Sequence, residues 1–325
     1  MYIMLSKIFS RYFWTMTAKR PHQASSWRAT LLLCLGLLSL NSWSQSAAQS
    51  ASGGKAEALL AKHKSLASAL ASNAYGRPLF LDSTESDNVV SGNAYAVLDA
   101  PFATVTTTFR SGNNWCDMMM LHINTKYCRA LPGSGPTLLK VNIGKKTPQT
   151  LQESFSLVFA MREATASNNL LLIQLNAENG PMGTSNYRIE LQATPLEDGK
   201  TFMHLRYSYQ YGTAGQLAMQ AYLATAGRGK VGFSTTGPVA ANAKAKYVGG
   251  ARGAVERNTM RYYLAIDAYL DALSLPPAQQ SSARLEKWFD ATEQYPLQLR
   301  EADKSSYLTM KKSEIQRQQS STPAL

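Results

Sequence analysis

The chain has 325 residues, of which 45% are hydrophobic and 17% are charged. This composition excludes collagen, coiled coil and bulk disorder for most of the chain, and the length allows one to three domains. The formal net charge of +12 raises the question of a nucleic-acid or membrane-surface partner.

The N-terminal segment has the features of a secretory signal peptide. Its apolar run, Ala29–Leu40, is too short to span a bilayer, which needs roughly 20 residues. Basic residues and no acidic ones precede this run, and the small-residue stretch Ser44–Ala48 follows it, as in signal peptides. We therefore predict a signal peptide over 1–48, cleaved after Ala48, and a periplasmic or secreted mature protein. The alternatives are a short membrane anchor and a cytosolic helix.

The predicted cleavage lowers the net charge of the mature protein. Residues 1–48 contain five basic residues and no acidic ones, so the mature chain carries +7. An exported protein with this modest excess does not meet genomic DNA. We expect no nucleic-acid partner, and no transmembrane segment after signal cleavage.

Two cysteines, Cys116 and Cys128, remain in the mature chain. An even number in an oxidising compartment favours a disulfide, which would add roughly 3 kcal/mol on the chain-entropy model. The alternative is two separate buried thiols. With only His122 nearby, the pair falls short of a four-ligand zinc spacing, so we expect no metal site.

The segment 49–92 is predicted to contain a linker, a helix and an edge strand. The helix is Ala56–Ser72, the strand is Arg77–Ser83, and the polar stretch Thr84–Val89 is expected to form a turn. After Asn93 the sequence predicts the strand Ala94–Asp99 and a helix from Pro101 to Phe109. Asn113–Met120 is expected to form a second short helix or a turn.

Six further strands are predicted from the alternation of apolar and polar residues, with turn residues between them. Short connections of this kind indicate an antiparallel meander. The predicted strands are His122–Leu131, Thr137–Lys145, Glu153–Glu163, Leu170–Glu178, Asn186–Thr194 and Thr201–Tyr211.

Helical periodicity returns after the last strand. Gly215–Ala226 and Val255–Leu273 are predicted helices, separated by a Gly/Ala/Lys-rich loop, Gly227–Gly253. We assign 93–273 to one domain. The segment 274–325 is predicted to be a charged helical C-terminal extension, interrupted at Pro296.

The stretch AYAVLDAPFATVTTTF (residues 94–109), followed by Trp115, resembles the start of domains of the START/polyketide-cyclase-like (SRPBCC) superfamily. The order of the predicted elements resembles that superfamily too. The resemblance implies an α+β helix-grip fold, in which a curved antiparallel sheet wraps around a C-terminal helix, here with extra N- and C-terminal helices. Because two helices follow the strands, we expect the second to fill the grip and the first to close one mouth.

Members of this superfamily bind lipids, sterols or polyketides, and some catalyse cyclisation or hydrolysis. The resemblance therefore implies a ligand cavity between the sheet and a helix. Tyrosines on the apolar sheet face could hold a ligand that has a polar end, whereas the alternative is simple core packing. The residues predicted to line the cavity are Phe155, Phe159, Ile173, Tyr187, Ile189, Leu205, Tyr207, Tyr209 and Arg261.

Polar side chains suggest few catalytic arrangements. Arg261 could pair with Glu190 or with a ligand carboxylate, or lie on a solvated face. His122, Asn124 and Lys126 share a face of a predicted strand, which would be a polar pocket or an exposed sheet face. No H-E-x-x-H, G-x-S-x-G or Walker A motif is present. Gly227–Gly232 fits G-x-G-x-x-G but follows a helix, so we expect no cofactor.

These patterns predict non-catalytic binding of a hydrophobic or amphipathic, lipid-like small molecule. An enzymatic alternative is a cyclase or hydrolase in the same cavity, which would need an inward-facing group such as His122 or Arg261. A second alternative is an envelope interaction protein, in which the C-terminal helices bind a protein partner.

Overall fold

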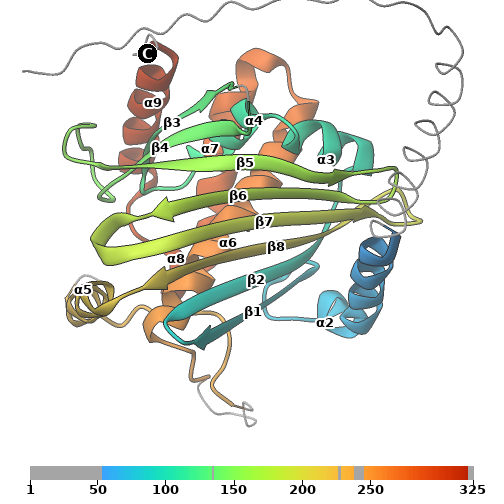
Figure 1. Cartoon of the computed structure of the whole chain (residues 1–325), viewed down its shortest axis with the longest axis horizontal. Helices are drawn as coiled ribbons and strands as arrows, with labels where there is room; N and C mark the ends of the chain where they lie inside the picture. Colours follow the sequence, from blue (N-terminus) through green and yellow to red (C-terminus); the bar gives the residue numbers. More distant parts are fainter. Residues whose placement is uncertain (1–52, 134, 226–227, 238–244, 321–325) are drawn as a thin grey trace, which may run out of the picture. The chain divides into compact units, whose positions relative to one another are not determined.

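The structure is built around one antiparallel sheet. The computed structural model describes residues 53–133, 135–225, 228–237 and 245–320. Within them, eight strands lie in the order β1-β2-β8-β7-β6-β5-β4-β3, and Figure 1 shows the sheet with helix α6 behind it. The strands are β1 Leu79–Ser86, β2 Val89–Leu98, β3 Thr125–Leu131, β4 Thr137–Ile143, β5 Phe155–Ala166, β6 Leu171–Asn179, β7 Thr184–Pro195 and β8 Thr201–Tyr211.

The α+β fold and all six strands of the meander are confirmed, with small differences at the strand ends. The first hairpin differs from the prediction. β1 continues to Ser86 and β2 already begins at Val89, so the turn is Asp87–Asn88 rather than Thr84–Val89. Asp87 and Asn88 have φ values of 50° and 63°. A two-residue turn with positive φ at both positions matches the twist of the flanking strands. Asp and Asn adopt this left-handed conformation more readily than most residues.

Two short helices carry the chain from β2 to the opposite edge of the sheet, where β3 lies. β2 pairs with β8 rather than β3, and α3 (Phe102–Phe109) and α4 (Gly112–Met119) form the crossing. The pattern around Pro101 predicted the first of them. The second begins after Ser111, whose hydroxyl accepts a hydrogen bond from the Asn114 N–H at 3.3 Å, as a helix N-cap does.

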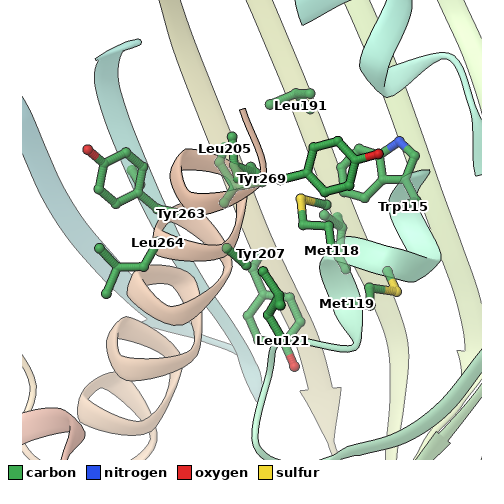
Figure 2. Close-up of a cluster of buried hydrophobic side chains, with 14 of the residues drawn as sticks. Trp115, Met118, Met119, Leu121, Leu191, Leu205, Tyr207, Tyr263, Leu264 and Tyr269 are labelled. Atoms are coloured by element: carbon green, nitrogen blue, oxygen red, sulfur yellow. The ribbon is translucent and has the colours of Figure 1, made fainter. Parts of the chain in front are cut away.

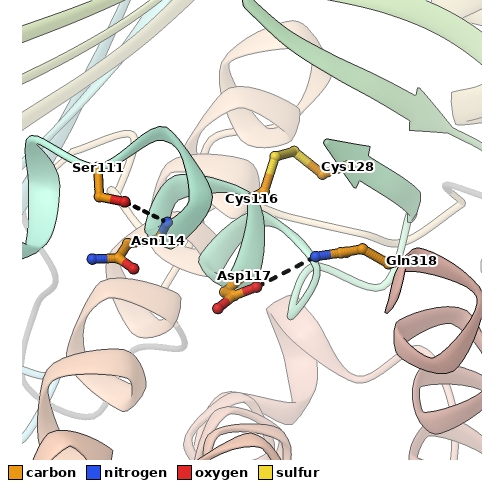
Figure 3. The surroundings of a disulfide bond; sticks show 6 residues. All are labelled: Ser111, Asn114, Cys116, Asp117, Cys128 and Gln318. Carbon is orange, nitrogen blue, oxygen red and sulfur yellow. Dashed lines mark hydrogen bonds between the residues drawn. A yellow bond between two sulfur atoms is a disulfide. The ribbon is translucent and has the colours of Figure 1, made fainter. Parts of the chain in front are cut away.

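The predicted disulfide is present. It joins Cys116 of α4 to Cys128 of β3 (Figure 3), and both cysteines are buried. The crossing segment is thereby tied to the edge strand it leads to. Figure 3 also shows Gln318 of α9 donating to the Asp117 carboxylate, at 3.3 Å, so the same helix contacts the C-terminal region.

Helix α6 (Gly250–Asp271) packs in the concave face of the sheet, as predicted for the second helix. Val255, Thr259 and Tyr263 recur at helical spacing and are buried. The helix comes so close to β2 that a Cβ on Gly92 would lie 2.4 Å from the Thr259 hydroxyl oxygen. Only glycine leaves room for that approach.

Helix α5 (Thr213–Ala224) leaves β8 directly and packs against the turn between β6 and β7. This turn contains the short 3₁₀ helix η1 (Pro181–Gly183). A Cβ on Gly215 would lie 3.0 Å from the carbonyl oxygen of Gly183, so the two backbones touch. The helix thus covers one end of the sheet, as we expected. The loop predicted over Gly227–Gly253 lies partly outside the described residues.

The C-terminal region forms helices α7 (Pro277–Glu293), α8 (Pro296–Leu299) and α9 (Lys304–Ser320). Their aromatic side chains belong to the main hydrophobic core. Trp288 donates its indole N–H to the Arg261 carbonyl at 3.0 Å, and the Tyr307 hydroxyl donates to the Leu121 carbonyl at 2.8 Å. The predicted helices and the break before Pro296 are therefore present, but the helices complete the core.

A buried charge cluster fixes α9 to β3. Glu314 accepts from Lys126 at 3.0 Å and from Lys311 at 2.6 Å, and all three side chains are at most 3% exposed. Lys311 also donates to the Thr125 carbonyl at 2.5 Å. Burial lowers the pKa of Lys311 to about 8, against the opposing effect of Glu314. Two lysines thus share one carboxylate away from water.

The N-terminal part of the described chain covers a small area of the outer sheet face. Residues 53–65 and α2 (Ala67–Ala71) are helical. Their leucines pack with Leu170 and Phe202 in a second, smaller core. The predicted signal peptide lies outside the described residues. Among the helices that the structure describes, none is long and apolar enough to cross a membrane.

We predict that replacing both cysteines, Cys116→Ala with Cys128→Ala, lowers the free energy of unfolding by about 3 kcal/mol, because the unfolded chain gains freedom. Urea unfolding of the oxidised wild type and the double variant measures this loss. Wild type kept reduced is the control and should unfold with the double variant. Equal urea midpoints for the oxidised protein and the double variant would contradict the prediction.

We also predict that stability rises with pH above about 8. The lowered pKa of Lys311 means that the unfolded chain binds this proton more tightly than the folded chain does. Raising the pH from 8 toward the ordinary lysine value of about 10.5 therefore favours folding.

Urea unfolding at several pH values below the range of tyrosine ionisation tests this. Lys311→Met should flatten the rise, because Lys126 and Glu314 remain as a neutral pair. Lys312→Met, at the exposed neighbouring position, is the matched control. An unchanged pH dependence in Lys311→Met would refute the assignment.

Candidate functional site

A pocket is lined by residues of the sheet, η1, α5 and α6. It lies near the end of the sheet where α5 follows β8; Figure 1 shows these two elements. Its volume is about 220 Å³. We call it the tyrosine pocket. Its lining residues are Pro181, Met182, Thr184, Tyr187, Tyr207, Tyr209, Gly215, Met219 and Asn258.

Three tyrosine rings form the sheet wall of the pocket. Tyr207 and Tyr209 are two residues apart on β8 and so lie on the same face, with ring centroids 5.8 Å apart. Tyr187 of β7 stacks on Tyr209 at 5.3 Å. The next tyrosine, Tyr211, instead donates its hydroxyl to Glu85 of β1. Tyr207 and Tyr209 thus share one face of β8, as the alternation predicts, whereas Tyr211 contacts the edge strand β1.

The hydroxyl groups of this wall stay uncharged. Tyr187 and Thr184 share a hydrogen bond of 2.8 Å. Burial raises the pKa of Tyr207 well above its ordinary value and also raises the pKa of Tyr209. Phenols of this kind remain protonated at neutral pH. The wall can therefore offer ring faces and hydroxyl groups, without charge, to a molecule in the pocket.

Asn258 is the polar residue that α6 contributes to the pocket. Its side-chain oxygen accepts from Arg261 at 3.3 Å. Asn258 also hydrogen-bonds with Tyr207, which lowers the pKa of that phenol and so opposes the larger effect of burial. The pocket is thus connected to a charged network behind α6.

That network corrects our expectation for Arg261. The Arg261 side chain is buried and forms an ion pair with Glu301 at 2.8 Å, not with Glu190. It does not line the tyrosine pocket. Glu301 also binds Lys146 at 2.7 Å. Burial alone would raise the pKa of Glu301, but Arg261 and Lys146 bring it below its ordinary value. Glu190 lies on the other sheet face, where it accepts from Gln174 and Gln192.

The predicted polar face of His122, Asn124 and Lys126 does not form. β3 begins only at Thr125, and each of the three residues has a separate place. His122 is buried beside Tyr262, with ring centroids 5.3 Å apart. Burial lowers the pKa of His122 well below its ordinary value, and Arg261 lowers it further. His122 is therefore neutral, and it does not line the tyrosine pocket.

Four of the predicted cavity residues lie in the packed core instead: Phe159, Ile173, Ile189 and Leu205. Side chains of α4 fill the space in front of the sheet there. Figure 2 shows Leu205 and Tyr207 in one cluster with Met118 and Trp115 of α4 and Tyr269 of α6. The concave face is thus mostly filled, and it stays open only at the α5 end.

Phe155 is a clear correction. It is 38% exposed and does not line the tyrosine pocket. Phe155 pairs with Ile143 of β4, but β6 begins to pair with β5 only at Ala160. The alternation is therefore correct, but Phe155 lies beyond the end of the neighbouring strand.

Sequence reasoning missed the residues that close the pocket. Met182, Met219 and Asn258 come from a turn and from two helices, and no local pattern distinguishes them from core or surface positions. For Met219, the sequence offered one indication: it lies on the helix that we expected to close one mouth of the cavity. Among the described residues, no group of three or more His, Cys, Asp or Glu could hold a metal ion.

We predict that Glu301→Gln lowers the free energy of unfolding by about 3 kcal/mol, because it leaves Arg261 buried without a carboxylate. Glu293→Gln is the control. Its partner Arg300 is 61% exposed, so that ion pair contributes much less to the free energy of unfolding. Urea unfolding near neutral pH measures both variants. Equal losses would show that the burial of Arg261 is not what makes Glu301 important.

Comparisons with known proteins find distant similarity to solved structures. No family model and no curated protein matches the sequence. The STAR-related lipid transfer protein (fragment 25–204) from Xanthomonas axonopodis is 8% identical, with a TM-score of 0.35, and the match covers 59% of this chain and 98% of that one. Ara h 8.0201 is 11% identical, with a TM-score of 0.34, covering 57% of this chain and 99% of that one. Human StAR-related lipid transfer protein 5 is 10% identical, with a TM-score of 0.30, and the match covers 54% of this chain and 90% of that one.

The architecture itself, an antiparallel sheet with a long helix in its concave face, is the α+β arrangement that we predicted.

Proposed function

We propose that this protein binds an uncharged, predominantly apolar small molecule in the tyrosine pocket and does not convert it chemically. The observation that carries the proposal is the composition of the lining. Three tyrosine rings and two methionines surround the space, and the described lining residues include no carboxylate, lysine, arginine, histidine or cysteine. Such a surface favours apolar contacts and a few hydrogen bonds. Burial raises the pKa values of its tyrosines, so they stay protonated and do not act as general bases at neutral pH. A cyclase or hydrolase is therefore the weaker candidate.

The size of the pocket limits its occupant. Small-molecule sites commonly measure about 300–1,000 Å³, whereas this one is about 220 Å³. A single ring system or the end of an acyl chain fits such a space, with the rest of the ligand outside. Met182, at the mouth, is 69% exposed, and a flexible thioether side chain adapts readily to different ligands.

The polar end of a ligand would lie at Asn258. Its amide is the one lining group that comes from α6, and Arg261 already fixes the amide oxygen. The ligand class that suits this end is an uncharged hydrogen-bonding group such as a hydroxyl, ester or amide. The expectation of an acidic headgroup on Arg261 is not part of the proposal, because Glu301 occupies that side chain.

Export to the periplasm is part of the same proposal. The signal-like segment 1–48 supports it, and so does the Cys116–Cys128 bond, because disulfides persist in oxidising compartments. An envelope partner for the C-terminal helices stays a prediction. Such a partner would have to use their exposed faces, since Trp288, Phe289 and Tyr307 are buried within this chain.

We predict that Met219→Trp weakens the binding of N-phenyl-1-naphthylamine, an uncharged probe whose fluorescence increases in apolar surroundings. The indole would occupy the space that the probe needs, and we expect at least a tenfold loss of affinity, which corresponds to about 1.4 kcal/mol. Fluorescence titration of wild type and variant measures it.

Leu217→Trp is the matched control. It adds the same side chain to the same helix, but Leu217 is 62% exposed and does not line the pocket. Its affinity for the probe should stay that of the wild type. The proposal is wrong if the probe does not bind saturably to the wild type, or if both tryptophan variants bind it equally well.

A further inference from the structure

A second hollow lies at the free edge of β1, and the proposed function does not use it. Its volume is about 550 Å³. β1 is the last strand on that side of the sheet. We call this hollow the edge cleft. The lining residues that matter here are Tyr75, Asp82, Phe233, Tyr247, Tyr295 and Gln298.

The edge cleft and the tyrosine pocket lie on different sides of α6. Asn258 lines the pocket, whereas Glu256 holds a wall of the edge cleft. The fully buried Glu256 carboxylate accepts from the backbone N–H groups of Phe233 and Ser234, at 2.6 and 2.9 Å, and from the Ser83 hydroxyl at 2.6 Å. These bonds fix the wall in place before any ligand arrives.

Aromatic rings form much of the surface of the edge cleft. Phe233 lies 6.0 Å from Tyr75 and 5.5 Å from Tyr295, measured between ring centroids. The Tyr295 hydroxyl donates to the Tyr75 carbonyl at 2.7 Å, which holds the rings together. Tyr247 adds a further ring from the segment after residue 244.

Gln298 presents a polar side chain to the edge cleft. The residue is 7% exposed and lines the cleft. Among the residues that the structure describes, nothing forms a hydrogen bond with its amide. Its amide atoms are not among the fully buried, unpaired side-chain atoms, so solvent reaches them, and the amide can donate to and accept from a molecule in the cleft.

The charge of the lining narrows the choice of that molecule. Among the described lining residues, Asp82 is the one charged side chain, and it already accepts from Asn93 at 2.7 Å. An anionic ligand would meet no cation in the lining. A purely apolar ligand would leave the Gln298 amide unpaired.

We infer that the edge cleft binds a neutral saccharide. The C–H faces of a sugar ring pack on aromatic rings, and its hydroxyl groups can both donate to and accept from the Gln298 amide and can donate to the free carboxylate oxygen of Asp82. The cleft is large enough for one or two sugar rings by the usual size of small-molecule sites, about 300–1,000 Å³. This second site is independent of the ligand in the tyrosine pocket.

The experiment titrates the full mature protein with three neutral disaccharides, cellobiose, maltose and N,N′-diacetylchitobiose, and follows binding by saturation-transfer NMR. We expect at least one of them to bind saturably. Gln298→Leu should weaken that binding at least tenfold, about 1.4 kcal/mol, because it removes the amide that donates to and accepts from the sugar hydroxyl groups.

The neighbouring Leu297, which is 54% exposed and does not line the cleft, supplies the control Leu297→Gln, which should bind as the wild type does. Gln298→Leu should also bind N-phenyl-1-naphthylamine normally, so that failure of one site is distinguishable from failure of the other. The inference is overturned if none of the three sugars binds saturably, or if Gln298→Leu binds them unchanged.

Discussion

Helix α6 is covered by the sheet on one side and by α7 and α8 on the other, so several of its charged side chains are buried, among them Glu256, Arg257 and Arg261. A buried charge without a partner is very costly, and each of these groups must therefore find a partner inside the protein. Glu256 takes three donors from β1 and from the segment at 233–234. Arg261 takes Glu301 and Asn258.

Satisfying these groups also shapes the two hollows of the molecule. Because Arg261 fixes the Asn258 oxygen, the amide that lines the tyrosine pocket has a defined orientation. Because Glu256 holds the backbone at Phe233 and Ser234, the edge cleft has a firm wall. One helix thus separates an uncharged apolar pocket from a more polar cleft, and the two differ in the ligand chemistry they favour.

The C-terminal helices are part of this arrangement. By composition, Glu301–Gln318 is almost entirely polar, and such a segment reads as a solvated tail. In the structure, Lys311 and Glu314 of this segment are buried with Lys126, and Glu301 closes the network around Arg261. These partners lie far apart in the sequence, so no local periodicity could have indicated that these charges are internal.

The sequence by itself determined the local structure, because period-two alternation, helical spacing and turn residues act over a few neighbouring positions. It was enough for the six meander strands, the long helix in the grip, the even cysteine pair and the row of tyrosines on one face of β8. The tertiary structure decided which part of that face stays open. Met118 and Trp115 of α4 fill most of the concavity, Phe155 lies beyond the end of β6, and Arg261 meets Glu301. The reason is physical: a side chain's face follows from its own strand or helix, whereas its neighbours there come from distant parts of the chain.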